Sequence, residues 1–139
     1  MPKLASGEAI ATLAIDEGPR HDPTKIEARA EKGAKGWSLS GVKAFVHEAE
    51  SADLFIVAAQ TGKGVALFLV PADAKGVERS ARRLTDSRSH AEVTFTNVAL
   101  SADALLGPED GAALLEQVLD RARAATCAEL LGLAEQAFQ

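Results

Sequence analysis

Residues 36–70 read GWSLSGVKAFVHEAESADLFIVAAQTGKGVALFLV, and the fold class follows from this stretch. Its first part alternates apolar with polar residues, which is typical of a strand with one face in the core. Two later runs, residues 54–59 and 65–70, are apolar throughout and predict strands that are covered on both faces. Because so few strands are not stable alone in water, the stretch must belong to a larger sheet or barrel.

A tight turn is predicted inside this stretch at Ser40 and Gly41, because glycine adopts positive φ at no steric cost. The chain then continues as a second strand. Its alternating side chains place Val42, Ala44 and Val46 on one face and Lys43, Phe45 and His47 on the other. We therefore expect Phe45 and His47 to lie together, opposite an apolar face.

Further strands are predicted on both sides of the stretch. Residues 9–15 are mostly small and apolar, residues 26–31 and 91–96 alternate, and residues 77–83 form a weaker, polar strand that suits a sheet edge. Residues 16–25 (DEGPRHDPTK) form a charged loop, since Gly-Pro and Asp-Pro both break regular structure. About seven short strands in all predict a mainly-β fold, an antiparallel sandwich or barrel.

The composition changes after residue 106. Residues 111–139 are rich in Ala, Leu, Glu, Gln and Arg without proline, which predicts one helix of about 43 Å. Its apolar stripe is longer than the strand domain can cover, so we expect it to pack on other helices and to mediate oligomerisation. No Gly or Pro stop closes the pattern. We expect a β domain at residues 1–106 and the start of a truncated helical domain at residues 107–139.

Charge and composition restrict the class of function. The chain has 139 residues, a net charge of −5 and 4% aromatic residues, which argues against nucleic acid as a partner. No secretory signal and no apolar run of about 20 residues is present, so we expect a cytoplasmic protein without a membrane span. The single cysteine, Cys127, fits a reducing compartment and is expected to be buried as a small apolar residue.

Common catalytic centres are not indicated. The three histidines lie far apart in sequence and no Cys/His cluster exists, which argues against a zinc site; His90, beside a strand start, is expected at the surface. No serine has a nucleophile-elbow context, and no glycine-rich phosphate loop opens a helix.

Five stretches, in this order and spacing, are similar to one known family: residues 7–17, 36–46, 52–58, 91–106 and 123–138. By them the chain resembles the acyl-CoA dehydrogenases, flavoproteins that oxidise acyl-CoA thioesters. The resemblance implies the middle β-barrel domain of that family, followed by the first long helix of its C-terminal domain. It also implies FAD as cofactor and acyl-CoA as substrate, and leaves the electron acceptor open.

The resemblance assigns roles residue by residue. The flavin would lie against the end of the first strand and the rim of the barrel, where Phe45 matches an aromatic residue that packs on the ring and His47 matches a Thr that donates to it. The substrate would contact the loop and the long helix. The implied cofactor-binding residues are Leu13, Ile15, Asp16, Phe45 and His47, and the implied substrate-binding residues are His21, Asp120 and Arg123.

Two departures from the family pattern bear on these roles. Asp16-Glu17 stands where the family has Thr-Glu, and an ionised aspartate accepts hydrogen bonds but cannot donate them to a flavin. Residues 20–22 (RHD) stand where the family has Gly-Ser-Asp; they could attract a phosphate or fill the space left for substrate. Asp120 and Arg123 could also simply pair with each other on the helix.

The family's catalytic base is a carboxylate in a later segment that has no counterpart in these residues. We therefore expect no acyl-CoA turnover by this chain alone and assign no catalytic residue. One alternative is a non-catalytic family member or assembly subunit with a degenerate flavin site. Another is an independent lipid- or ligand-binding barrel, which predicts a closed cavity and a monomer.

Overall fold

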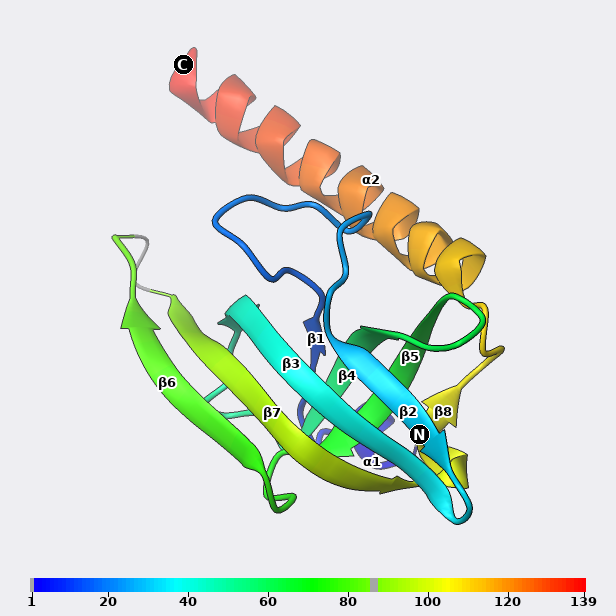
Figure 1. The fold of residues 1–139 in the computed structure, drawn as a ribbon. Coiled ribbons are helices and arrows are strands. Elements are labelled where there is room, and N and C mark those ends of the chain that lie inside the picture. The colour runs from blue at the N-terminus through cyan, green and yellow to red at the C-terminus, as the bar shows by residue number, and fades with distance from the viewer. Residues whose placement is uncertain (1, 86–87) are drawn as a thin grey trace.

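The computed structural model describes residues 2–85 and 88–139, and these residues confirm a mainly-β fold followed by one long helix (Figure 1). Within them, no helix is both long and apolar enough to cross a membrane. The elements, in chain order, are α1 (Pro2–Ala5), β1 (Ala11–Ala14), β2 (Arg29–Gly33), β3 (Gly36–His47), β4 (Leu54–Gln60), β5 (Val65–Pro71), β6 (Val77–Arg83), β7 (Ser89–Ser101), the 3-10 turn η1 (Ala102–Ala104), β8 (Leu105–Leu106) and α2 (Ala112–Ala137).

The described strands form one open sheet in the order β6-β7-β3-β2-β4-β5-β8, with β1 added to β4. The expectation of a closed barrel is therefore wrong. The two ends of this order are β6 and β8, and the weakest pairing within it joins β2 to β4 through Arg29 and Gln60. The expectation of purely antiparallel strands also fails, because β1 and β2 both run parallel to β4. In sequence β3 lies between β2 and β4, and the chain crosses back from β3 to add β4 beside β2. A connection of this kind can join parallel strands, whereas a tight hairpin cannot.

The predicted turn at Ser40 and Gly41 is absent, because β3 continues through both residues. Its register against β7 shifts twice, once between Leu39 and Gly41 and once between Lys43 and Val46. Gly41 has φ of +149°, and a Cβ atom there would lie 2.4 Å from the Cβ of Ala28. Glycine is thus required by a close approach of two backbones in a β-bulge, and not by a turn.

The predicted faces of this strand are wrong at Val42 and Lys43, whereas Val46 is buried and Phe45 and His47 are exposed as predicted. Lys43, expected on the outer face, is fully buried, and Val42, expected inside, is 42% exposed. Phe45 has φ of 51°, in the left-handed region, and is 41% exposed, and His47 is exposed beyond it. Alternation of side chains holds only while the register is regular, so each bulge reassigns the faces that follow it.

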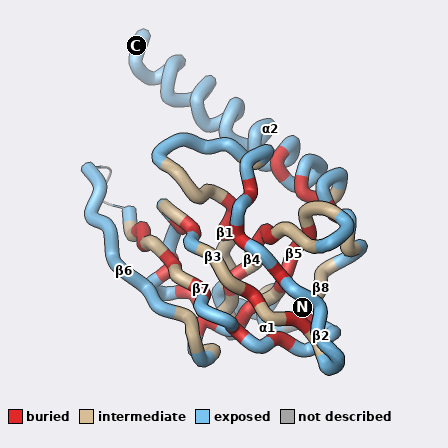
Figure 2. The backbone as a smooth tube through the Cα atoms, in the orientation of Figure 1, coloured by how far each residue is buried: buried red, intermediate tan, exposed pale blue. Residues whose placement is uncertain are grey.

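The core lies mainly inside the curved sheet (Figure 2). Trp37 contacts Phe68 edge-on with ring centroids 5.1 Å apart, and Phe55 contacts Phe95 in the same manner at 6.1 Å. A second, smaller apolar cluster joins the sheet to the first turns of α2; its buried members are Ile15, Ile26, Ala58, Leu67, Leu115 and Leu119.

Only the beginning of α2 packs on the sheet, and Figure 2 shows the remainder in the colour of exposed residues. From Asp120 to the end of the helix every residue is exposed, including Leu130 and Leu133. Cys127 lies in this part, so the prediction that it is buried is wrong. The helix extends past the sheet, as its length predicts, and nothing in the described chain covers its far half.

Candidate functional site

Two segments implied by the family resemblance lie side by side at one end of β3. We call residues 12–16 and 43–47 together the candidate wall. Three hydrogen bonds join them: Thr12 Oγ1 donates to the His47 carbonyl at 2.7 Å, Lys43 Nζ donates to the Ile15 carbonyl at 2.9 Å, and the Ala44 N–H donates to the Asp16 carbonyl at 2.7 Å. Residues about 30 positions apart in sequence therefore form one continuous surface.

The five candidate cofactor residues all belong to this wall, but they differ in what they expose. Phe45 and His47 are exposed, whereas Leu13 and Asp16 are half-buried. Ile15 is only 5% exposed, and its side chain packs in the cluster beneath α2. A ligand on the wall would therefore meet the backbone of Ile15 and not its side chain.

Phe45 is the residue of the wall that combines strain with exposure. A non-glycine residue in the left-handed region costs about 1 kcal/mol, and the register shift next to Phe45 is what imposes this conformation. The ring gains little from burial in return, since it is 41% exposed. Strain that packing does not explain is typical of a functional position.

His47 stacks on a second histidine. It is the register partner of His90 on β7, and the two ring centroids are 4.1 Å apart at an interplanar angle of 54°. His90 is 3% exposed, so its predicted surface position is wrong. On the other side of β7, the register partner of His90 is Arg82 of β6, so His90 lies on an inner strand of the sheet.

Asp16 and His21, assigned above to different ligands, contact each other. His21 Nδ1 lies 3.0 Å from both carboxylate oxygens of Asp16, and the Asp22 N–H donates to Asp16 Oδ1 at 3.1 Å. Because a carboxylate only accepts, Nδ1 carries the proton and Nε2 faces away from Asp16. A side-chain hydrogen bond from Thr24 lowers the pKa of Asp22. The polar side chains of the loop therefore bind groups of the same loop.

Asp120 and Arg123 are brought together on α2, one turn apart. Arg123 Nη1 lies 2.6 Å from Asp120 and 2.5 Å from Glu116, and all three side chains are exposed. The hydrogen bonds of the guanidinium, first to Glu116 and then to Asp120, raise the pKa of Arg123. The contacts found for this pair lie within the helix, which matches the simple pairing considered from sequence.

A buried ion pair that the sequence did not indicate lies directly behind the wall. Lys43 Nζ is 2.5 Å from Glu17 Oε1, with exposed side-chain fractions of 0% and 13%. Burial is the main cause that lowers the pKa of Lys43, and the hydrogen bond and charge of Glu17 oppose it. The one available signal was Gly41, because a glycine in a strand can mark a bulge that exchanges the two faces.

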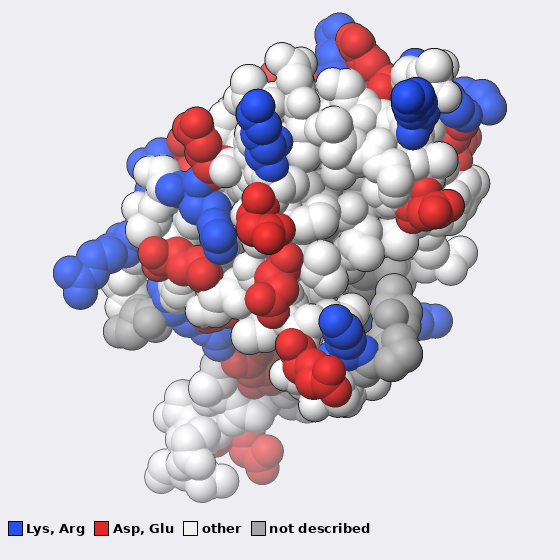
Figure 3. Space-filling model, turned by 90° about the horizontal axis from the view of Figure 1, so that it is seen from below, with Lys and Arg blue, Asp and Glu red and all other residues white. Residues whose placement is uncertain are grey.

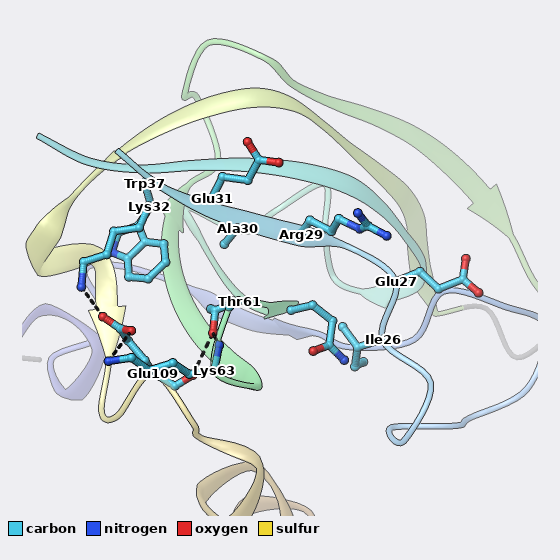
Figure 4. A pocket seen from close by; sticks show the side chains of 12 residues that line it. Ile26, Glu27, Arg29, Ala30, Glu31, Lys32, Trp37, Thr61, Lys63 and Glu109 are labelled. Carbon is cyan, nitrogen blue, oxygen red and sulfur yellow. Dashed lines mark hydrogen bonds and ion pairs between the residues drawn. The ribbon is translucent and has the colours of Figure 1, made fainter. Parts of the chain in front are cut away.

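A large cavity lies elsewhere in the described chain. We call it the β2 groove, an open space of about 930 Å³ between β2, the turn after β4 and Glu109 (Figure 4). Lys32 and Lys63 both pair with Glu109, the latter at 3.0 Å, and their hydrogen bonds lower the pKa of Glu109. Lys32 also lies 5.2 Å from the centre of the Trp37 ring. The groove contains no residue of the candidate wall.

The charges on one face of the molecule are of mixed sign. On the face seen in Figure 3, acidic and basic side chains are interspersed, unlike the one-sign basic field of a nucleic-acid-binding surface. Among the described residues, no group of three or more His, Cys, Asp or Glu side chains could hold a metal ion.

Comparison with known proteins bears on this arrangement. Residues 11–98 match the family described as acyl-CoA dehydrogenase, middle domain. Long-chain specific acyl-CoA dehydrogenase of Mus musculus is 32% identical over 122 residues, which cover 79% of this chain and 28% of that protein. Short/branched chain specific acyl-CoA dehydrogenase of Bos taurus is 30% identical over 147 aligned positions, gaps included, and the alignment covers 99% of this chain and 34% of that protein.

A solved structure agrees with these relatives. Glutaryl-CoA dehydrogenase from Mycobacterium smegmatis, crystallised in complex with FADH2, superposes with a TM-score of 0.70 at 30% identity, over 75% of this chain and 28% of that chain. The present chain thus spans about a third of the length of the curated relatives above. The resemblance drawn from the sequence is confirmed: the chain belongs to the acyl-CoA dehydrogenase family, and residues 11–98 correspond to its middle domain.

Proposed function

We propose that this chain supplies the flavin-facing wall, and part of the acyl-CoA cleft, of an acyl-CoA dehydrogenase. The observation that carries the proposal is the exposed, strained Phe45 at the end of β3, tied by hydrogen bonds to residues 12–16. The glutaryl-CoA dehydrogenase of similar fold contains FADH2, which supports a flavin as the ligand. Phe45 and His47 line neither the β2 groove nor the cavity of the loop, so other parts of the enzyme would complete the cleft.

The residues of the wall fit FAD. Phe45 offers an aromatic face, Leu13 an apolar contact, and His47 an imidazole; Ile15 and Asp16 would contribute backbone groups. The negative charge of Asp16, which would oppose a reduced flavin, is directed at His21 and the Asp22 N–H instead. When bound, the flavin would supply the hydride acceptor for α,β-dehydrogenation.

The acyl-CoA would approach from the side of the loop and of α2. We propose contacts from His21, whose Nε2 is free of Asp16, and from the Asp120–Arg123 pair. Arg20 and Lys25 line a neighbouring cavity of about 240 Å³ in the same loop, where they could attract a phosphate.

The catalytic base would come from outside these residues. Glu17 is held by Lys43 and two amides, Asp16 by His21, and Asp22 by Thr24, so each carboxylate of the loop is already engaged. We expect no reduction of an electron-accepting dye by the chain with FAD and an acyl-CoA. Dye reduction that depends on the acyl-CoA would contradict this part of the proposal.

We further propose that the exposed half of α2 packs on other helices in an oligomer. Leu130, Leu131 and Leu133 are 58%, 71% and 61% exposed within about one turn of the helix. Replacing Leu130 and Leu133 by serine should convert an oligomer to a monomer in sedimentation velocity. A wild-type chain that sediments as a monomer at every concentration would contradict this role.

The flavin role is tested by Phe45→Gly. This change removes the ring but also the left-handed strain, so the free energy of unfolding should stay within about 1 kcal/mol of the wild type. FAD affinity, measured by flavin fluorescence, should fall about tenfold because the aromatic contact is lost. Phe45→Tyr should keep the affinity, and Phe138→Ala, at an aromatic that is 92% exposed on the far helix, serves as the matched control. Equal affinity in Phe45→Gly and wild type would overturn the proposal.

A non-catalytic family member remains the second candidate, and the Asp16–His21 contact favours it. These two side chains occupy the loop where the family leaves space for ligand, and they bind each other. In this case the chain would stay colourless with excess FAD, and His21→Ser with Asp16→Thr would restore a flavin absorbance band.

A further inference from the structure

Lys43 is a buried cation that the proposed function leaves without a role. Its side chain is fully buried in the middle of β3, and its ammonium donates to the Ile15 carbonyl at 2.9 Å and to Glu17 at 2.5 Å. A buried lysine is costly unless its charge is paired and its donors are used, so the surrounding groups must be held in place around it.

Glu17 is held by backbone as well as by Lys43. Its Oε2 accepts the Glu27 N–H at 2.6 Å, and its Oε1 accepts the Ala28 N–H at 3.0 Å. One carboxylate therefore joins both ends of the loop at residues 17–28 to the centre of β3. Ala28 is in turn the residue against which Gly41 packs, so the same contact places the bulge.

The neighbours of this ion pair are residues of the candidate wall. The Asp16 carbonyl accepts the Ala44 N–H at 2.7 Å, and Phe45 follows directly in the left-handed conformation. Asp16 adjoins Glu17 in sequence, and Ala44 adjoins Lys43. A shift of either charged residue would therefore move the backbone on which Asp16 and Phe45 are displayed.

We propose that Lys43 and Glu17 are positioning residues: their buried ion pair fixes the loop at residues 16–28 against β3 and thereby sets the relative positions of Asp16 and Phe45. The consequence for flavin binding rests on the proposed function, whereas the fixing of the loop does not. Neither side chain would touch the flavin, because Lys43 is enclosed and the carboxylate of Glu17 is turned to its three donors.

Hydrogen exchange tests the fixing of the loop without any flavin. Glu17→Gln keeps the size of the side chain but loses the charge and the acceptor for one amide. Exchange of the Glu27, Ala28 and Ala44 amides should accelerate about tenfold more than exchange of the Val57 and Phe68 amides, which are register partners in the β4–β5 ladder. Lys43→Met should show the same selectivity if it stays folded, and Glu109→Gln, at the exposed pairs of the β2 groove, should show none.

A uniform acceleration across both groups of amides would overturn the inference, since it would mean that the pair supports only global stability. A second arm measures FAD affinity of the same 139-residue variants by flavin fluorescence. Glu17→Gln should weaken FAD binding about tenfold, and Glu109→Gln should leave it unchanged. If exchange accelerates only at the loop amides while FAD affinity is unchanged, the ion pair fixes the loop but has no effect on flavin binding, and that part of the inference fails. If the wild type binds no FAD at all, the proposed function fails, and the exchange result still decides whether the ion pair fixes the loop.

Discussion

The two ends of β2 are held by two ion pairs that differ in the exposure of their lysine. Just before the strand, Glu17 binds the Ala28 amide and the fully buried Lys43. At its far end, Lys32 pairs with Glu109 in the open β2 groove, with 63% of the lysine side chain exposed. An exposed lysine can exchange its partner for water, so its position is weakly determined. A buried lysine has no such alternative, and it forces the groups around it into one arrangement.

The largest effect should come from Lys43→Met. Removing one partner leaves the Glu17 carboxylate, which is 13% exposed, without its counter-charge, and we expect the free energy of unfolding to fall by about 3 kcal/mol. Urea unfolding followed by the fluorescence of Trp37, the one tryptophan of the chain and a core residue, measures this. A stability equal to the wild type would mean that the loop end of β2 is held no more firmly than the groove end.

The next largest effect should come from Gly41→Ala, which acts on the same end of β2 without touching a charge. The new methyl group would meet the Cβ of Ala28 at 2.4 Å in a backbone conformation that disfavours side chains. We expect a loss of about 2 kcal/mol in the same urea assay. Gly62→Ala, at a glycine with open space around it, is the matched control and should cost much less. Equal losses would show that the Gly41–Ala28 approach is not tight.

A smaller effect should appear in the pH dependence of stability. Burial lowers the pKa of Lys43 in the folded chain below its ordinary value of 10.5, so between the folded and the unfolded pKa the unfolded chain binds more protons. Stability from this group therefore rises with pH across that window. The difference in unfolding free energy between wild type and Lys43→Met should grow as the pH approaches 10.5. A difference that shrinks with rising pH would contradict a Lys43 whose pKa is lowered by burial.

The smallest effect should come from Lys63→Met at the groove end. Its ammonium lies 3.0 Å from Glu109, but 69% of the side chain is exposed and Lys32 also pairs with that carboxylate. We expect no resolvable shift of the urea midpoint at moderate salt. A loss as large as that of Lys43→Met would remove the contrast between the two ends of β2.

Much of the fold could be predicted from the sequence. The continuous apolar runs at β4 and β5 and the alternation at β7 mark strands, and the unbroken helical composition marks α2, because these signals are local. The open sheet, with β6 and β8 at its ends, could not be predicted, since it depends on which distant strands pair. The bulges of β3 were missed for the same reason: the need for glycine at position 41 arises from Ala28, thirteen residues earlier in the chain.

The candidate site was also predicted in part: features that follow from local alternation or from the family resemblance were found, and features that depend on register or loop folding were not. Phe45 and His47 were placed on one face by the alternation of the strand, and their exposure agrees with it. Periodicity alone placed Lys43 beside them, which is wrong, because the register shift between Lys43 and Val46 turns the lysine inward. The contact between Asp16 and His21 depends on how a loop with two prolines folds back, and no periodic signal describes such a loop.

The most direct test of the candidate wall is a titration of the chain with FAD, followed residue by residue in amide NMR spectra. Saturable shifts should be concentrated at residues 13–17 and 44–47, and FMN should reproduce them if the isoalloxazine ring is what binds. Gly41→Ala, which disturbs the bulge, should weaken the response at both segments. Shifts confined to the β2 groove, or none at millimolar FAD, would contradict a flavin-facing wall at Phe45.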